Sequence, residues 1–87
     1  MMDDAALAAA FRAHMEGQTK FTRRMVITMA LMSDEPPKQI VRRCERLRLC
    51  KPGAWAWFAR NGGIAAGHIA EVRADLRHPA NGASSHG

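Results

Sequence analysis

Apolar residues recur at helical spacing along most of this chain. Leu7, Phe11 and Met15 lie four residues apart, so that they share one face of a helix. Asp3 or Asp4 can cap the start of that helix, and the glycine two residues after Met15 can end it in a left-handed conformation. The pattern therefore predicts a first helix over about residues 4–16.

A second helix is predicted from a cap at Thr19 to about Met32. Its apolar stripe consists of Phe21, Met25, Met29 and Met32. Other apolar residues fill most of its remaining faces, at Val26, Ile27, Ala30 and Leu31. A helix that is apolar on most sides is packed by neighbours all around. We therefore expect this helix to be the central one and its methionines to belong to the core.

The segment SDEPP breaks the pattern and starts a third helix, with Ser33 or Asp34 as its cap and about Leu47 as its end. At 100° per residue, Ile40, Cys44 and Leu47 fall on one side of this helix. Three arginines fall on the other side, namely Arg42, Arg43 and Arg46. The third helix is thus expected to bury one face and to present a basic face to solvent.

Two further helices complete the prediction. Pro52 suits the first turn of a short fourth helix that residues 61–63 terminate, and a fifth helix follows over about residues 65–76. No segment has the alternation expected of a strand. The predicted class is all-α, a compact bundle of four to five short helices with a central hydrophobic helix. Residues 1–77 form one domain, and residues 78–87, which lack large apolar side chains, form a disordered tail. The predicted core comprises Leu7, Phe11, Phe21, Met25, Met29, Met32, Ile40, Cys44, Leu47, Leu49, Trp57, Phe58, Ile69, Val72 and Leu76.

Composition limits what so short a chain can do. Its 87 residues provide one modest core and leave little room for a large catalytic pocket. No nucleophile–base pair, phosphate-binding glycine loop or metal-ligand spacing is present, so we expect no enzyme activity, no cofactor and no metal. The cysteines, Cys44 and Cys50, would lie about 240° apart on one helix and are expected to be reduced thiols of a cytoplasmic protein. The N-terminus has no signal-peptide pattern, and no apolar run suffices to cross a membrane.

The net charge of +5 is concentrated in the middle of the chain. Residues 36–62 contain seven basic side chains and one acidic side chain, which gives +6, whereas the segments on either side are close to neutral. Such a concentration favours an anionic partner such as nucleic acid, an acidic protein surface or anionic lipid. A solvated basic face that only aids solubility explains the charge equally well.

Residues 40–58, with the sequence IVRRCERLRLCKPGAWAWF, resemble the helix-turn-helix of bacterial and phage DNA-binding proteins. With Ile40 as the first position, Cys44 occupies the small fifth site of that family's pattern. The four apolar sites are then occupied by Leu47, Leu49, Ala54 and Trp57. The segment departs from the pattern at Arg48, where glycine is usual, and at Arg43, where an apolar residue is usual. A residue other than glycine adopts the left-handed turn conformation at a cost of about 1 kcal/mol.

The resemblance implies a small DNA-binding or transcription-associated module, with a homodimer as a possible state. The expected phosphate contacts are Arg42, Arg43, Arg46, Arg48, Lys51 and Arg60. The fourth helix has no side chain between Pro52 and Phe58 that can pair with a base edge, so contacts to phosphates would dominate. In a second register the third helix itself lies on the nucleic acid, although the acidic residues of the preceding turn then lie near the interface.

A protein-interaction role is the alternative. Trp55 and Trp57 are two residues apart, about 200° around a helix, so they cannot both face one core. Either both indoles cover the core from different sides, or Trp57 belongs to the core and Trp55 to a contact surface, since exposed tryptophan beside arginine is typical of interfaces. In that case the chain is a helical adaptor that uses Trp55 and the same arginines to bind an acidic protein or a second copy of itself.

Overall fold

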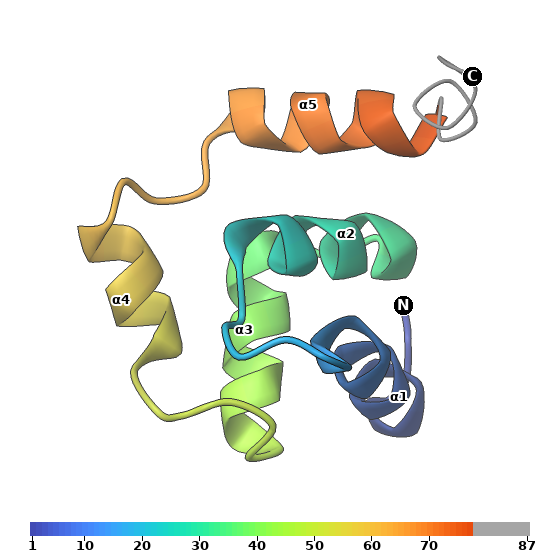
Figure 1. Cartoon of the computed structure of the whole chain (residues 1–87), viewed down its shortest axis with the longest axis vertical. Coiled ribbons are helices and arrows are strands. Elements are labelled where there is room, and N and C mark those ends of the chain that lie inside the picture. The colour runs from blue at the N-terminus through green and yellow to red at the C-terminus, as the bar shows by residue number, and fades with distance from the viewer. Residues whose placement is uncertain (78–87) are drawn as a thin grey trace.

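The computed structural model describes residues 1–77, and within this range it contains α-helices and no strand. The helices are α1 (Asp4–Met15), α2 (Arg23–Ser33), α3 (Pro37–Arg46), α4 (Ala54–Arg60) and α5 (Ala66–Arg77), as Figure 1 shows. The all-α class and the approximate range of each predicted helix are therefore confirmed. The predicted disordered tail, residues 78–87, lies outside the described residues.

The capping residues explain where the first two helices begin. Asp3 caps α1, since its Oδ1 accepts a hydrogen bond from the backbone N–H of Ala6 at 2.8 Å. We predicted Thr19 as the cap of α2, but the cap is Thr22. The Oγ1 atom of Thr22 accepts a hydrogen bond from the backbone N–H of Met25 at 3.2 Å. The helix begins three residues later than predicted because Phe21, which the prediction placed inside it, reaches into the core from the preceding connection.

The turn between α2 and α3 also differs from the prediction. Neither Ser33 nor Asp34 caps α3, which starts at Pro37 without a side-chain cap. Ser33 is the buried last residue of α2, and its hydroxyl contacts Glu35 and accepts the N–H of Met2 at 2.8 Å. Asp34 adopts the left-handed conformation that ends α2, with φ of 54°. Both residues therefore form the end of α2 and do not cap α3.

Helix α2 is central, as predicted, because it packs against α1, α3 and α5. Figure 1 shows α2 running across α3, α5 lying alongside α2, and α1 and α4 on opposite sides of α3. This arrangement leaves one side of α3 and the outer side of α4 without a covering helix. The uncovered side of α3 carries candidate functional residues described below.

About half of the predicted core residues are fully buried in the structure. The buried ones are Leu7, Phe11, Met29, Ile40, Cys44, Phe58 and Val72, joined by four that the core prediction omitted, Val26, Ile27, Ala30 and Val41. Phe21, Leu47 and Leu49 are half-buried and pack against this cluster. Three predictions were wrong, because Met32, Trp57 and Leu76 are exposed by 60%, 52% and 43%. Met32 and Leu76 lie in the last turns of α2 and α5, and Trp57 lies in the middle of the short helix α4.

Candidate functional site

Arg43 does not belong to the exposed basic face on which the sequence placed it. Its side chain is only 13% exposed, and its guanidinium donates to the Glu35 carboxylate at 2.5 Å and to Asp4 at 2.9 Å. It also donates to the backbone carbonyl of Met2 at 2.8 Å. The prediction failed because Arg43 lies at the edge of the basic face, beside the N-terminal segment and the α2–α3 turn. Since its donors are occupied within the protein, we remove it from the candidate nucleic-acid contacts.

The acidic partners of Arg43 form one network with it. Burial raises the pKa of the Glu35 carboxyl, but hydrogen bonds from Ser33 and Gln39 and the positive charge of Arg43 outweigh that effect, so the pKa lies below its ordinary value. A hydrogen bond from Arg43 likewise lowers the pKa of Asp4. Glu35 is thus an ionised, compensated group that contributes little negative charge to the surface near α3.

Three other cations of α3 do share one exposed face. Lys38, Arg42 and Arg46 are exposed, and each is four residues from the next, which aligns them along the helix. The opposite face of α3 is buried through Ile40 and Cys44. Arg46 lies 3.4 Å from Asp4, but both side chains are largely exposed, so this ion pair is weak. We call these three side chains the α3 ridge.

The connections on either side of α3 differ in length. Asp34, Glu35 and Pro36 join α2 to α3, a turn as short as that of a helix-turn-helix, with its left-handed residue at Asp34. Residues 47–53 join α3 to α4, a longer segment in which Arg48 adopts the left-handed conformation with φ of 59°. Arg48 therefore takes the backbone conformation for which the family pattern uses glycine, but the shorter turn is the one before α3.

The remaining predicted phosphate contacts lie apart from the ridge. Arg48 is exposed just beyond the end of α3, and Lys51 is exposed in the same connection, closer to α4. Arg60 is exposed at the end of α4, on a different helix. Of the six predicted contacts, the structure thus brings Arg42 and Arg46 together on α3, with Lys38, a residue that the prediction omitted.

The two tryptophans have roles opposite to those predicted. Trp55 is half-buried and packs against the core, whereas Trp57 is exposed. Trp55 shares a helix face with the buried Phe58, three residues on, and that face packs against α3. The spacing from Trp55 to Phe58 was the sequence signal that could have assigned the two tryptophans correctly.

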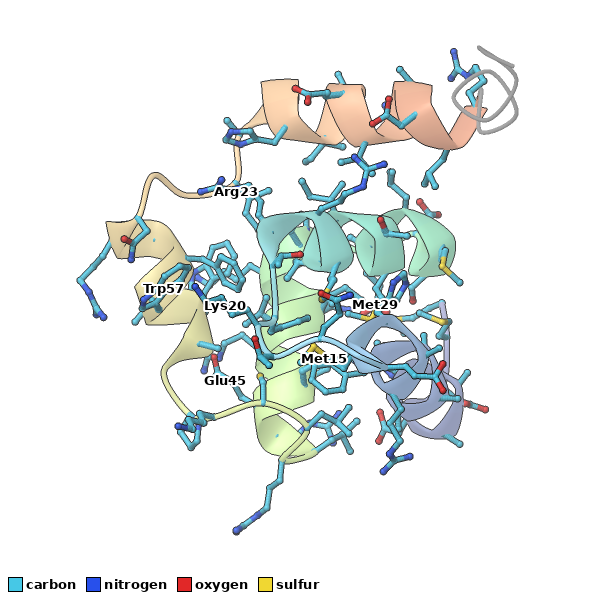
Figure 2. The ribbon with its side chains drawn as sticks, viewed as in Figure 1. Met15, Lys20, Arg23, Met29, Glu45 and Trp57 are labelled. Atoms are coloured by element: carbon cyan, nitrogen blue, oxygen red, sulfur yellow. The ribbon has the colours of Figure 1, made fainter. Side chains whose placement is uncertain are left out.

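Two polar residues that the sequence analysis did not single out hold α4 in place. The Oε2 atom of Glu45 accepts the backbone N–H of Trp55 at 2.9 Å, which ties the start of α4 to α3. Arg23 donates to the carbonyl oxygens of Asn61 and Gly63, each at 2.9 Å, which holds the α4–α5 connection against α2. Figure 2 labels Glu45 and Arg23 at these two places.

The cysteines are free thiols rather than a ligand pair. The angle predicted from the sequence assumed that both cysteines lie on one helix. They do not, because Cys50 lies beyond the end of α3. Burial raises the pKa of Cys44 to about 12 and that of Cys50 to about 11. Within residues 1–77, no three His, Cys, Asp or Glu side chains are grouped so as to hold a metal ion.

Comparison with known proteins gives no family assignment, since no family model, curated protein or solved structure matches this chain. Across residues 1–77, none of the helices has both the length and the apolar character that a membrane crossing requires.

Proposed function

We propose that this protein is a small nucleic-acid-binding module and that α3 is the helix that lies against the nucleic acid. The observation that carries the proposal is the α3 ridge, in which Lys38, Arg42 and Arg46 are exposed and aligned on one face. Cations at this spacing can contact successive phosphates, and arginine can also pair with guanine in the major groove.

The α2–α3 pair supports this assignment better than the α3–α4 pair does. Helix α2 crosses α3 after a three-residue turn and is its buried support, as in the second register considered above. The acidic character of that turn is reduced because Glu35 is buried and paired with Arg43. By contrast, the exposed side of α4 offers Ala56 and Trp57, which lack the paired donors and acceptors that read bases, and the single cation of α4, Arg60, lies at the end of the helix.

Under this proposal the chain is a transcription-associated module of bacterial or phage type that acts in the cytoplasm. Its affinity comes mainly from phosphates, because the ridge offers three cations and few groups that select a sequence. Three phosphate contacts give a slope of about −2.7 in the logarithm of the binding constant against the logarithm of salt concentration. A fourfold rise in salt should then weaken binding about fortyfold.

Fluorescence anisotropy with a short labelled duplex of random sequence tests the proposal. The variant Lys38→Gln/Arg42→Gln/Arg46→Gln should lose most of the binding and most of the salt dependence. The control Arg12→Gln/Arg73→Gln/Arg77→Gln removes the same charge from exposed positions on α1 and α5 and should bind much as the unmodified protein does. Equal losses in the two variants would show that net charge alone drives binding and would contradict the proposal.

A further inference from the structure

A second surface feature lies beside α4, away from the α3 ridge. It is a groove of about 520 Å³ between the end of α1, the α1–α2 connection and α4. Its apolar lining includes Phe11, Met15, Phe21, Leu49, Trp57 and Phe58. Figure 2 labels Met15, Lys20 and Trp57, which contribute to the groove from these three elements. We call it the α4 groove.

A row of aromatic rings connects the core to this groove. Phe21 packs edge-on against Phe11 and Phe58, with ring centroids 5.0 Å and 6.0 Å apart. Phe58 in turn packs edge-on against Trp57, with centroids 5.4 Å apart. Phe11 and Phe58 are buried and hold the row in place, whereas Trp57 is half exposed at its outer end. Trp57 is thus an apolar side chain of fixed position that is available to a partner, and tryptophan is the residue most enriched among interface hot spots.

The charged residues that line the groove are both positive. Among the described residues that line it, the charged ones are Lys20 and Lys51, and none is acidic. Both lysines are exposed, while the surface between them is apolar. An occupant that matches this pattern has apolar side chains on one face and carboxylates beside them.

We propose that the α4 groove binds an acidic amphipathic helix of a partner protein. The apolar face of that helix packs on Trp57 and Met15, and its flanking carboxylates pair with Lys20 and Lys51, which is the helix-in-groove form of peptide recognition. A nucleic-acid strand fits this surface less well, because the groove is mainly apolar and the aligned cations lie on α3. The inference is therefore independent of the nucleic-acid-binding proposal and uses a different surface.

Tryptophan fluorescence of the full chain tests the inference. The variant Trp55→Phe leaves Trp57 as the reporter, and the probe is a synthetic helical peptide with leucines on one face and glutamates on the other. We expect saturable binding with a shift of the Trp57 emission to shorter wavelength. The same peptide with lysine in place of glutamate, or with serine in place of leucine, should not bind.

Substitutions, measured by calorimetry with the same peptide, identify the groove as the place of binding. Trp57→Ala should weaken peptide binding about tenfold, and Lys20→Gln/Lys51→Gln about fivefold. The control Met32→Ala removes an apolar side chain of similar exposure outside the groove and should leave the affinity unchanged. Variants of the α3 ridge should also retain peptide binding, and Trp57→Ala should retain binding to the duplex.

Several results would overturn the inference. Equal binding of the glutamate and lysine peptides would show that the two lysines select nothing, and no binding of the glutamate peptide would exclude such an occupant. Self-association in sedimentation experiments that Trp57→Ala abolishes would identify a second copy of this chain as the occupant. Loss of duplex binding in Trp57→Ala, with circular dichroism unchanged, would assign the groove to nucleic acid instead.

Discussion

The ion pair between Arg43 and Glu35 provides a test of how α3 is held in the fold. Replacing Arg43 by methionine keeps most of the side-chain volume but removes the cation that faces Glu35. The Glu35 side chain is 2% exposed, so its carboxylate cannot recover hydration by a small movement. It retains contacts with Ser33 and Gln39, whereas Asp4 loses its closest cationic partner.

The expected cost is large for a protein of this size. Removing one partner of a buried ion pair costs about 3–5 kcal/mol, and the lower end applies here because Glu35 keeps two hydrogen-bond donors. A chain of 87 residues has a free energy of unfolding of about 4–13 kcal/mol in total. With a urea dependence of about 1 kcal/mol per molar, the loss moves the unfolding midpoint down by about 3 M. Circular dichroism at increasing urea measures this shift, and Arg42→Met, on the exposed side of α3, should change the free energy by less than about 0.5 kcal/mol.

The loss in the free energy of unfolding caused by Arg43→Met should depend on pH. In the unmodified protein the pKa of Glu35 lies below its ordinary value of 4.5, so this group stabilises the fold above pH 4.5 and loses that effect as the pH falls through the lower pKa. Without Arg43, less positive charge offsets the effect of burial on the Glu35 carboxyl, so its pKa rises. The difference in stability between the two proteins should therefore shrink as the pH falls from 7 to 4. A difference that stays constant over this range, or a cost as small as that of Arg42→Met, would refute the argument.

Three further outcomes follow from local contacts. Thr22→Ala should destabilise the protein by about 1 kcal/mol through loss of the α2 cap, while Thr19→Ala should have little effect; equal effects in urea denaturation would contradict the assigned cap. Glu45→Ala should leave the N–H of Trp55 without its acceptor, lower stability by about 1 kcal/mol and shift tryptophan emission to longer wavelength, and unchanged emission would argue against the contact. Because burial raises the pKa of Cys50 to about 11, alkylation of this thiol should be slow at pH 7.5 and accelerate steadily toward pH 11; a rate that levels off near pH 8.5 would contradict that pKa.

The fold class and helix ranges were predictable because they depend on local patterns. The spacing of apolar residues set the helices, and the SDEPP segment and residues 61–63 marked breaks. The caps were less predictable, since Thr19 and Thr22 are equally able to cap a helix. Tertiary packing decided between them, because Phe21 packs against Phe11 and Phe58 from outside the helix.

The site was only partly predictable because its charges depend on distant neighbours. A helical projection placed Arg42 and Arg43 on the same basic face, yet only Arg43 lies near acidic groups. Those groups are 8 and 39 residues away in the chain, at Glu35 and Asp4, and no local pattern reveals such pairs. The exposure of Trp57 has a similar origin, since α4 is short and packs against the rest of the fold mainly through α3.

The central claim is that α3 presents the surface that binds nucleic acid, and a nuclear magnetic resonance titration tests it most directly. Isotopically labelled protein is titrated with a short random duplex at low and at moderate salt. We expect chemical-shift changes at Lys38, Arg42 and Arg46 that decline as salt increases, with smaller changes over α4. Changes centred on Trp57, or no changes at low salt, would contradict the claim.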